Sequence, residues 1–227
     1  MQPPSSAVIP ITVATDSVWT PRLILASASP RRRELMACFD LDYTVQPAAI
    51  DESPRAGEQA CDYVVRMAEE KALAVTARHP EQFVLAADTS VVLEGRILGK
   101  PATPARARSM LESLSDRVHQ VITAVSLITP GANQGRGPHN RLSSTDVWFA
   151  ELSAAWIEAY VASGDPMDKA GAYGIQNAAG LKIRRIDGSY SGVVGLPLYE
   201  TAALLEAADR AAARLRELAT HDAKVLA

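Results

Sequence analysis

The chain has 227 residues, enough for one large hydrophobic core or two small lobes. Its formal net charge is only −3, so no overall basic field holds a nucleic-acid polymer, and a phosphate must meet a local cluster of charges. Residues 1–21 do not resemble a signal peptide, and no segment approaches the roughly 18 apolar residues of a membrane span. We therefore expect a cytoplasmic protein without a membrane partner and with a flexible N-terminal extension over residues 1–21.

Cys38 and Cys61 are the two cysteines of the chain, and neither stands in a C-x-x-C pair. This spacing argues against a disulfide framework or a zinc site. We expect both thiols to be reduced and packed as small apolar groups.

Apolar runs and turn residues predict strands and helices that interleave with hairpins. In chain order the prediction is strand 23–26, helix 31–37, strand 42–46, loop 51–54, helix 59–77, strand 83–87, a hairpin of 91–93 and 97–98, helix 104–114, strands 118–128 and 142–150, helix 153–161, strand 181–186 and helix 198–218. The glycine-rich segment 130–140 is expected to be a mobile hairpin tip. This pattern predicts a mixed-sheet α/β domain with two lobes around a cleft.

Ser27 lies where the first predicted strand ends, and Pro30 begins a helix that carries Arg31 and Arg32 in its first turn. Backbone N–H groups, hydroxyls and guanidinium groups at a helix start can together hold an anion. The alternative is an ordinary helix cap, with Ser29 at the N-cap, followed by solvated arginines.

Asp88 follows the apolar strand 83–87 and is expected at its tip. A carboxylate held there could orient a water molecule or bind a divalent cation. The alternative is a turn aspartate.

Lys100 lies in the sequence GRILGKP, which resembles a P-loop but has the wrong glycine spacing and a proline in place of Ser or Thr.

Three further residues are candidates for the same chemistry. Glu52, in a polar loop, could be a second metal carboxylate, and Lys71 could reach a phosphate from its helix. Gln176 follows several glycines in a segment where a ligand can approach the backbone, and its amide can both donate and accept hydrogen bonds. Each of them could equally be a surface or turn residue.

Taken in order, these segments resemble the Maf family of nucleotide pyrophosphatases. The matching stretches are LILASASPRRREL (23–35), DESP (51–54), YVVRMAEEKA (63–72), LAADTSVVLEGRILGKP (85–101), YVASGDPMDKAGAYGIQ (160–176) and GSYSGVVGLPLYET (188–201). The resemblance implies an elongated, twisted mixed sheet with flanking helices and two lobes around a central cleft. It places one catalytic domain at 22–218 and a tail at 219–227, and it implies a homodimer.

The resemblance also implies an activity and the residues that carry it. Family members hydrolyse a nucleoside triphosphate to the monophosphate and pyrophosphate with a divalent cation such as Mg²⁺, Mn²⁺ or Co²⁺. Asp88 matches the proton acceptor of the family, and with Glu52 it is the expected metal ligand. The matching polar cleft residues are Ser27, Arg31, Arg32, Glu52, Lys71 and Lys100.

Three positions distinguish two branches of the family. Arg31, Thr89 and Gln176 resemble the dTTP/UTP pyrophosphatases, whereas the 7-methyl-GTP branch tends to have Trp, Gln and Glu there. A carboxamide matches the donor and acceptor edge of uracil or thymine. The alternatives are a pyrophosphatase for 7-methyl-GTP or another modified nucleotide, and a nucleotide-binding regulator of cell division. Asp88 together with two lysines argues against a purely binding role.

Overall fold

The structure is a computed structural model that describes residues 23–130 and 137–225, with side chains through Ala211. The predicted flexible extension 1–21 lies outside the described residues, as do residues 131–136 of the predicted hairpin tip and residues 226–227 of the predicted tail. Among the described residues, no helix is both long and apolar enough to cross a membrane.

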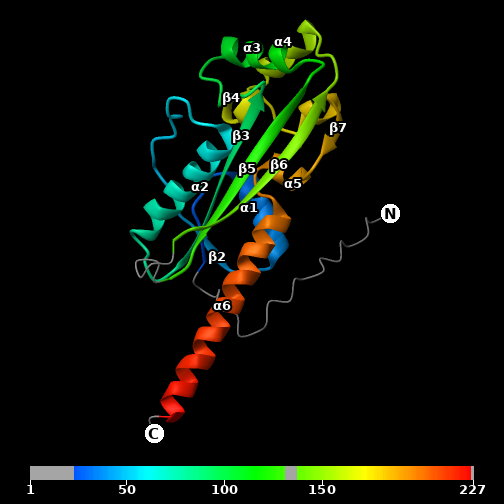
Figure 1. Cartoon of the computed structure of the whole chain (residues 1–227). Coiled ribbons are helices and arrows are strands. Elements are labelled where there is room, and N and C mark those ends of the chain that lie inside the picture. Colours follow the sequence, from blue (N-terminus) through cyan, green and yellow to red (C-terminus); the bar gives the residue numbers. More distant parts are fainter. Residues whose placement is uncertain (1–22, 131–136, 226–227) are drawn as a thin grey trace, which may run out of the picture.

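Strands and helices are interspersed along the described chain (Figure 1). The strands are β1 (Leu23–Leu25), β2 (Tyr43–Val45), β3 (Phe83–Leu93), β4 (Arg96–Leu98), β5 (Val118–Ile128), β6 (His139–Phe149) and β7 (Ile183–Asp187). The α-helices are α1 (Pro30–Met36), α2 (Ala60–Thr76), α3 (Pro104–Leu114), α4 (Ala154–Ala162), α5 (Tyr190–Val194) and α6 (Leu198–Val225). Short 3₁₀ helices are η1 (Ala37–Phe39), η3 (Asp165–Asp168), η4 (Ala170–Ala172) and η5 (Ala178–Lys182).

The strands of the described residues form one mixed, twisted sheet (Figure 1). Its order is β2-β1-β3-β5-β6-β7, with β4 added to β3. β1 runs parallel to both β2 and β3, because helical crossovers separate these strands in the sequence. The remaining pairs are antiparallel. The predicted mixed α/β fold with flanking helices is therefore confirmed.

The sheet has a gap along one edge of β3. On that edge β1 pairs with residues 83–85 and β4 with residues 91–93, whereas β5 pairs with 84–92 on the other edge. Within the described part of the chain, no strand pairs with residues 86–90 on the gapped edge. Asp88 thus lies in the middle of an 11-residue strand, and its prediction at a strand tip was wrong. The partner strand β1 ends opposite Leu85, three residues before Asp88, whereas the pairing with β5 continues past Asp88 to Val92.

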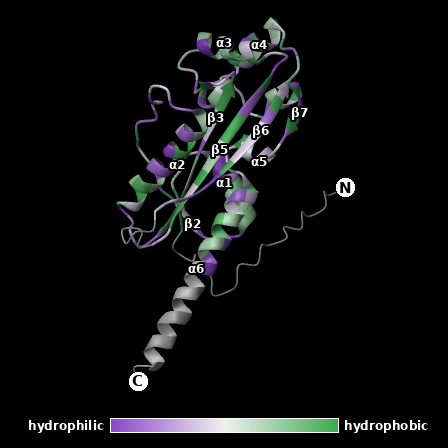
Figure 2. Cartoon of the chain, in the orientation of Figure 1, coloured by the Kyte–Doolittle hydropathy of each residue, from purple (hydrophilic) through white to green (hydrophobic). Residues whose placement is uncertain are grey.

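Two packed regions lie on either side of this gap (Figure 1). In one, α2 packs on one face of the sheet, and α1 and α6 pack on the other. In the second, α3 and α4 cover the far ends of β3, β5 and β6. Figure 2 shows hydrophobic residues along β3 and β5 and both kinds on α2, as expected for a helix with one buried face. The two lobes of the prediction correspond to these regions.

Several boundaries differ from the sequence prediction. β6 begins at His139 rather than 142, because it continues its ladder against Leu127 of β5. The last helix continues to Val225 rather than 218, so residues 219–225 of the predicted tail are helical, since neither Gly nor Pro interrupts the chain after Leu198.

The cysteine prediction was half right. Cys38 and Cys61 are both free, but both are exposed rather than packed in the core. Cys38 lies in η1, where the next residue, Phe39, turns inward instead. Cys61 lies in the first turn of α2, ahead of Tyr63 and Val64, where burial begins.

Candidate active site

A cavity of about 700 Å³ opens at the gap in the sheet, between the two lobes. Its walls come from the β1–α1 turn, residues 47–54, the middle of β3, the turn after β4, residues 168–177 and the end of α5. Every site residue predicted from the sequence lines it: Ser27, Arg31, Arg32, Glu52, Lys71, Asp88, Thr89, Lys100 and Gln176. The fold therefore brings together residues that lie up to 149 positions apart.

Asp88 and Lys71 form a buried ion pair at the centre of the cavity. Asp88 Oδ1 lies 2.7 Å from Lys71 Nζ, and both residues are less than a tenth exposed. Burial raises the pKa of the Asp88 carboxyl above its ordinary value, while the charges of Lys71 and Arg32 oppose this shift. The result is a buried carboxylate whose proton affinity is raised by burial, with the charges of two cations acting in the opposite direction.

Glu52 is the second carboxylate on the same ammonium group. Its Oε1 lies 2.8 Å from Lys71 Nζ. Partial burial opposes ionisation of Glu52, but the Lys71 hydrogen bond and the charges of Lys71, Lys100 and Arg32 outweigh it and lower the pKa of Glu52. Tyr63 OH donates a hydrogen bond to the Glu52 carbonyl at 2.8 Å, and so holds this loop against α2.

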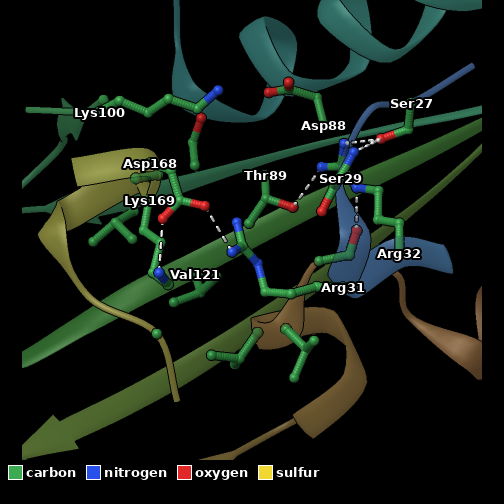
Figure 3. A pocket seen from close by; sticks show the side chains of 18 of the residues that line it. Ser27, Ser29, Arg31, Arg32, Asp88, Thr89, Lys100, Val121, Asp168 and Lys169 are labelled. Atoms are coloured by element: carbon green, nitrogen blue, oxygen red, sulfur yellow. Dashed lines mark hydrogen bonds and ion pairs between the residues drawn. The ribbon is translucent and has the colours of Figure 1, made fainter. Parts of the chain in front are cut away.

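Arg32 is held in place by three acceptors from different parts of the chain. Its Nε donates to the Gly195 carbonyl at 2.8 Å, and its terminal nitrogens donate to Ser27 Oγ at 3.2 Å and Thr89 Oγ1 at 3.3 Å (Figure 3). Burial lowers the pKa of the guanidinium, and the nearby Asp88 charge opposes that effect. Because its orientation is already set, Arg32 can meet an anion with little further ordering.

Thr89 and Asp88 are neighbours on β3 and therefore point to opposite faces of the sheet. Asp88 meets α2, while Thr89 meets Arg32 and Thr123. The two threonine hydroxyls lie 2.9 Å apart, and Thr123 Oγ1 donates to the Gly192 carbonyl at 2.8 Å. Thr123 was not predicted as part of this site, because nothing in its strand sequence indicates its partner. Both faces reach the cavity because, among the described strands, none pairs with β3 at this point on its gapped edge, whereas β5 pairs with it on the other.

Arg31 reaches across the cavity to residues that the prediction did not include. Its NH1 lies 3.0 Å from Asp168 Oδ2, and Asp168 Oδ1 lies 2.7 Å from Lys169 Nζ (Figure 3). Asp168 and Lys169 stand in the glycine-rich segment singled out from the sequence, where only Gln176 was selected. Their charges were a signal in the sequence, but their partners depend on the fold.

Lys100 and Gln176 face the cavity from the two walls of the second lobe. Both are exposed, and within the described residues Lys100 makes no ion pair. The structure thus presents a cationic side chain and a carboxamide to whatever enters the cavity.

In the part of the chain that the structure describes, two carboxylates, those of Asp88 and Glu52, meet at the Lys71 ammonium. Among the described residues, no group of three or more His, Cys, Asp or Glu side chains is arranged to hold a metal ion. Two carboxylates nevertheless fit Mg²⁺, which is commonly held by one or two of them together with substrate phosphates and water.

A mixed α/β fold with a buried carboxylate and several cations around one cavity defines a protein that binds and acts on phosphate compounds. The profile of the family described as "Maf-like protein" matches residues 22–208, so the chain belongs to the Maf family.

Individual proteins agree with the family match. The chain is 51% identical over 186 residues to the dTTP/UTP pyrophosphatase of Myxococcus xanthus, covering 82% of this chain and 92% of the relative. It is 51% identical over 189 residues to the dTTP/UTP pyrophosphatase of Alcanivorax borkumensis, covering 82% and 95%. A solved HAM1 protein from Coxiella burnetii is 21% identical, with a TM-score of 0.39 over 58% of this chain and 74% of that one, too low to support an argument.

Proposed function

We propose that this protein is a nucleoside triphosphate pyrophosphatase that hydrolyses dTTP and UTP to the monophosphate and pyrophosphate. The observation that carries the proposal is the buried Asp88–Lys71 pair in a cavity lined by further cations. The names of relatives that are about half identical to the chain support the same reaction and the same substrates.

Hydrolysis at the α-phosphorus needs a base for the attacking water and positive charge for the leaving pyrophosphate. We assign the base to Asp88, because burial raises its pKa and brings its basicity closer to that needed near neutral pH. Arg32, Lys71 and Lys100 neutralise the phosphate oxygens. Arg32 is preorganised by its three acceptors, whereas Lys100 is a mobile point charge.

The preference for one nucleobase over another follows from the cavity wall that carries Gln176. A carboxamide donates and accepts at once, as the edge of uracil or thymine requires, whereas a carboxylate suits the N–H groups of guanine. Uracil and thymine differ by one methyl group, worth about 1–3 kcal/mol in a fitted pocket. We therefore propose both UTP and dTTP as substrates, with Arg31 and Thr89 completing the specificity set.

We propose that Asp88 and Glu52 hold a divalent cation, Mg²⁺, Mn²⁺ or Co²⁺, together with the substrate phosphates. The hard oxygen atoms of the two carboxylates suit such an ion, and both lie against the same ammonium. When bound, the ion supplies further positive charge to the phosphates. We also propose one catalytic domain over residues 22–218 and, following the family resemblance, a homodimer in the cytoplasm.

The deciding experiment is product analysis with UTP, dTTP, CTP, GTP and 7-methyl-GTP in the presence of Mg²⁺ or Mn²⁺. We expect pyrophosphate and a nucleoside monophosphate from UTP and dTTP, and no turnover after EDTA is added. Release of orthophosphate instead, or turnover of 7-methyl-GTP above that of UTP, contradicts the proposal.

A further inference from the structure

A network of charged and polar groups lies behind the cavity wall formed by residues 168–177. At its centre is the Asp165 carboxylate, which is partly buried and is not among the residues that line the cavity. It accepts hydrogen bonds from Tyr160 OH at 2.5 Å and from Asn177 Nδ2 at 2.6 Å, and it lies 3.2 Å from Lys169 Nζ. A carboxylate with three donors is firmly oriented, so it can in turn orient its partners.

One arm of this network runs from Asp165 to Arg31. Lys169 is only 8% exposed, and its Nζ donates to the Asp165 carbonyl at 2.6 Å and to Asp168 Oδ1 at 2.7 Å. The other oxygen of Asp168 pairs with Arg31 NH1 at 3.0 Å, across the cavity from η3 to α1 (Figure 3). A continuous chain of polar contacts thus connects Asp165 to the guanidinium of Arg31 on the opposite lobe.

The other arm runs from Asp165 to the segment that carries Gln176. Asn177, the next residue, donates its side-chain amide to Asp165 Oδ1, and its carbonyl accepts from Gly180 N at 2.9 Å. Tyr160 OH, itself bound to Asp165, accepts from Gly174 N at 3.3 Å. The backbone on both sides of Gln176 is therefore tied to the same carboxylate.

The charges of the network explain why Asp165 matters to residues it does not touch. Lys169 is a buried ammonium that shares two carboxylates, Asp165 and Asp168. If Asp165 loses its charge, the Lys169 ammonium must interact more strongly with the Asp168 carboxylate, because a buried cation without a partner is costly. Asp168 is then less available to Arg31, while the hydrogen bond from Asn177 that anchors the Gln176 segment is weakened, because its acceptor is no longer charged.

We propose that Asp165 is a positioning residue that holds Arg31 and Gln176 in a set relation across the cavity and thereby determines which nucleobase the cavity accepts. The inference rests on the proposed function, since it concerns the substrate of the same cavity. Asp165 lies outside the Asp88–Lys71–Glu52 group, so its effect is on binding and discrimination rather than on the chemical step.

The test compares Asp165→Asn with the wild type and with a matched control, Asp116→Asn, which breaks an exposed ion pair to Arg184 outside the cavity. Binding of non-hydrolysable UTP and GTP analogues is measured by calorimetry, and kcat and KM are measured for UTP. For Asp165→Asn we expect about 10-fold weaker binding of the UTP analogue and a smaller UTP-over-GTP preference, with kcat within about twofold of the wild type. The Asp116→Asn protein should match the wild type.

A lower melting temperature with unchanged analogue binding and unchanged preference shows a merely structural role and overturns the inference. So does an equal effect of Asp116→Asn. If Asp165→Asn does not fold, the exposed Asp168→Asn cuts the Arg31 arm alone and should reduce the same preference; an unchanged preference then overturns the inference. A wild type that binds the UTP analogue without cleaving UTP refutes the proposed function only, and a wild type that binds no analogue refutes both.

Discussion

Lys71 and Asp88 lie 2.7 Å apart, on two elements whose buried faces meet at the gap in the sheet. Lys71 belongs to the buried face of α2, and Asp88 has the same orientation on β3 as Val84 and Ala86, which pack beneath that helix. Each charge offsets part of the cost of burying the other.

Asp88→Asn should lower kcat for UTP by about 10²–10⁴-fold, because the amide cannot accept the proton of the attacking water. The melting temperature should stay within about 5 °C of the wild type, since Lys71 keeps Glu52 as a partner. Steady-state kinetics and thermal melting check both points. An unchanged kcat removes Asp88 as the base.

Lys71→Met should raise the pKa of Asp88 further, because one of the two cations that oppose the burial effect is lost. Activity requires ionised Asp88 and therefore declines as the pH falls through this pKa. The acid limb of the kcat/KM profile should move to higher pH. Lys182→Met, outside the cavity, is the matched control and should keep the wild-type profile. An acid limb that stays in place contradicts this view of the pair.

Gln176→Glu should reduce kcat/KM for UTP and dTTP by about 10-fold or more, since a carboxylate cannot donate to a carbonyl of the base. The UTP-to-GTP ratio should fall with it. Gln82→Glu makes the same chemical change in the turn before β3, away from the cavity, and should leave the ratio as it is. Competition between the two nucleotides in one assay measures the ratio directly, and equal ratios for both variants refute the assignment.

His119 should make stability depend on pH. It is 2% exposed, and burial lowers its pKa from 6.5 to about 4. The folded protein therefore favours neutral His119, so this stabilisation is complete above pH 6.5 and is lost as the pH falls toward 4. The free energy of unfolding should drop by about 2 kcal/mol between pH 7 and pH 5 from this residue alone.

Chemical denaturation at the two pH values checks this, with His119→Gln expected to remove the drop. His139→Gln changes an exposed histidine and should retain it. A drop that persists in His119→Gln means that other groups cause it.

Local patterns in the sequence were enough for much of the fold and for membership of the site. The three- and four-residue spacing of apolar side chains predicted α2 nearly to its ends, and the long apolar runs predicted β5 with the bounds found. The motif residues, from Ser27 to Gln176, all reach one cavity. Periodicity and turn chemistry are properties of neighbouring residues, so they are visible before the chain folds.

Pairing between distant segments could not be predicted in this way. Asp88 was expected at a strand tip, because the apolar run ends there, but the strand continues along β5 and the gap arises where β1 stops. Thr123 and the Asp165–Lys169–Asp168 network were missed for the same reason, since their sequence positions give no sign of Thr89 or Arg31.

The sequence by itself determined which residue types are present, their helical and extended spacing, and the ordered motifs that indicate the Maf family. The tertiary structure alone decided that none of the described strands pairs with residues 86–90 of β3 on one edge, so that Asp88 and Thr89 line one cavity from opposite faces of the sheet. It also decided that Lys71 neutralises Asp88 while Arg31 pairs with Asp168. Charges separated by many residues interact only when the packing of apolar faces brings them within a few ångströms, and that packing belongs to the whole chain.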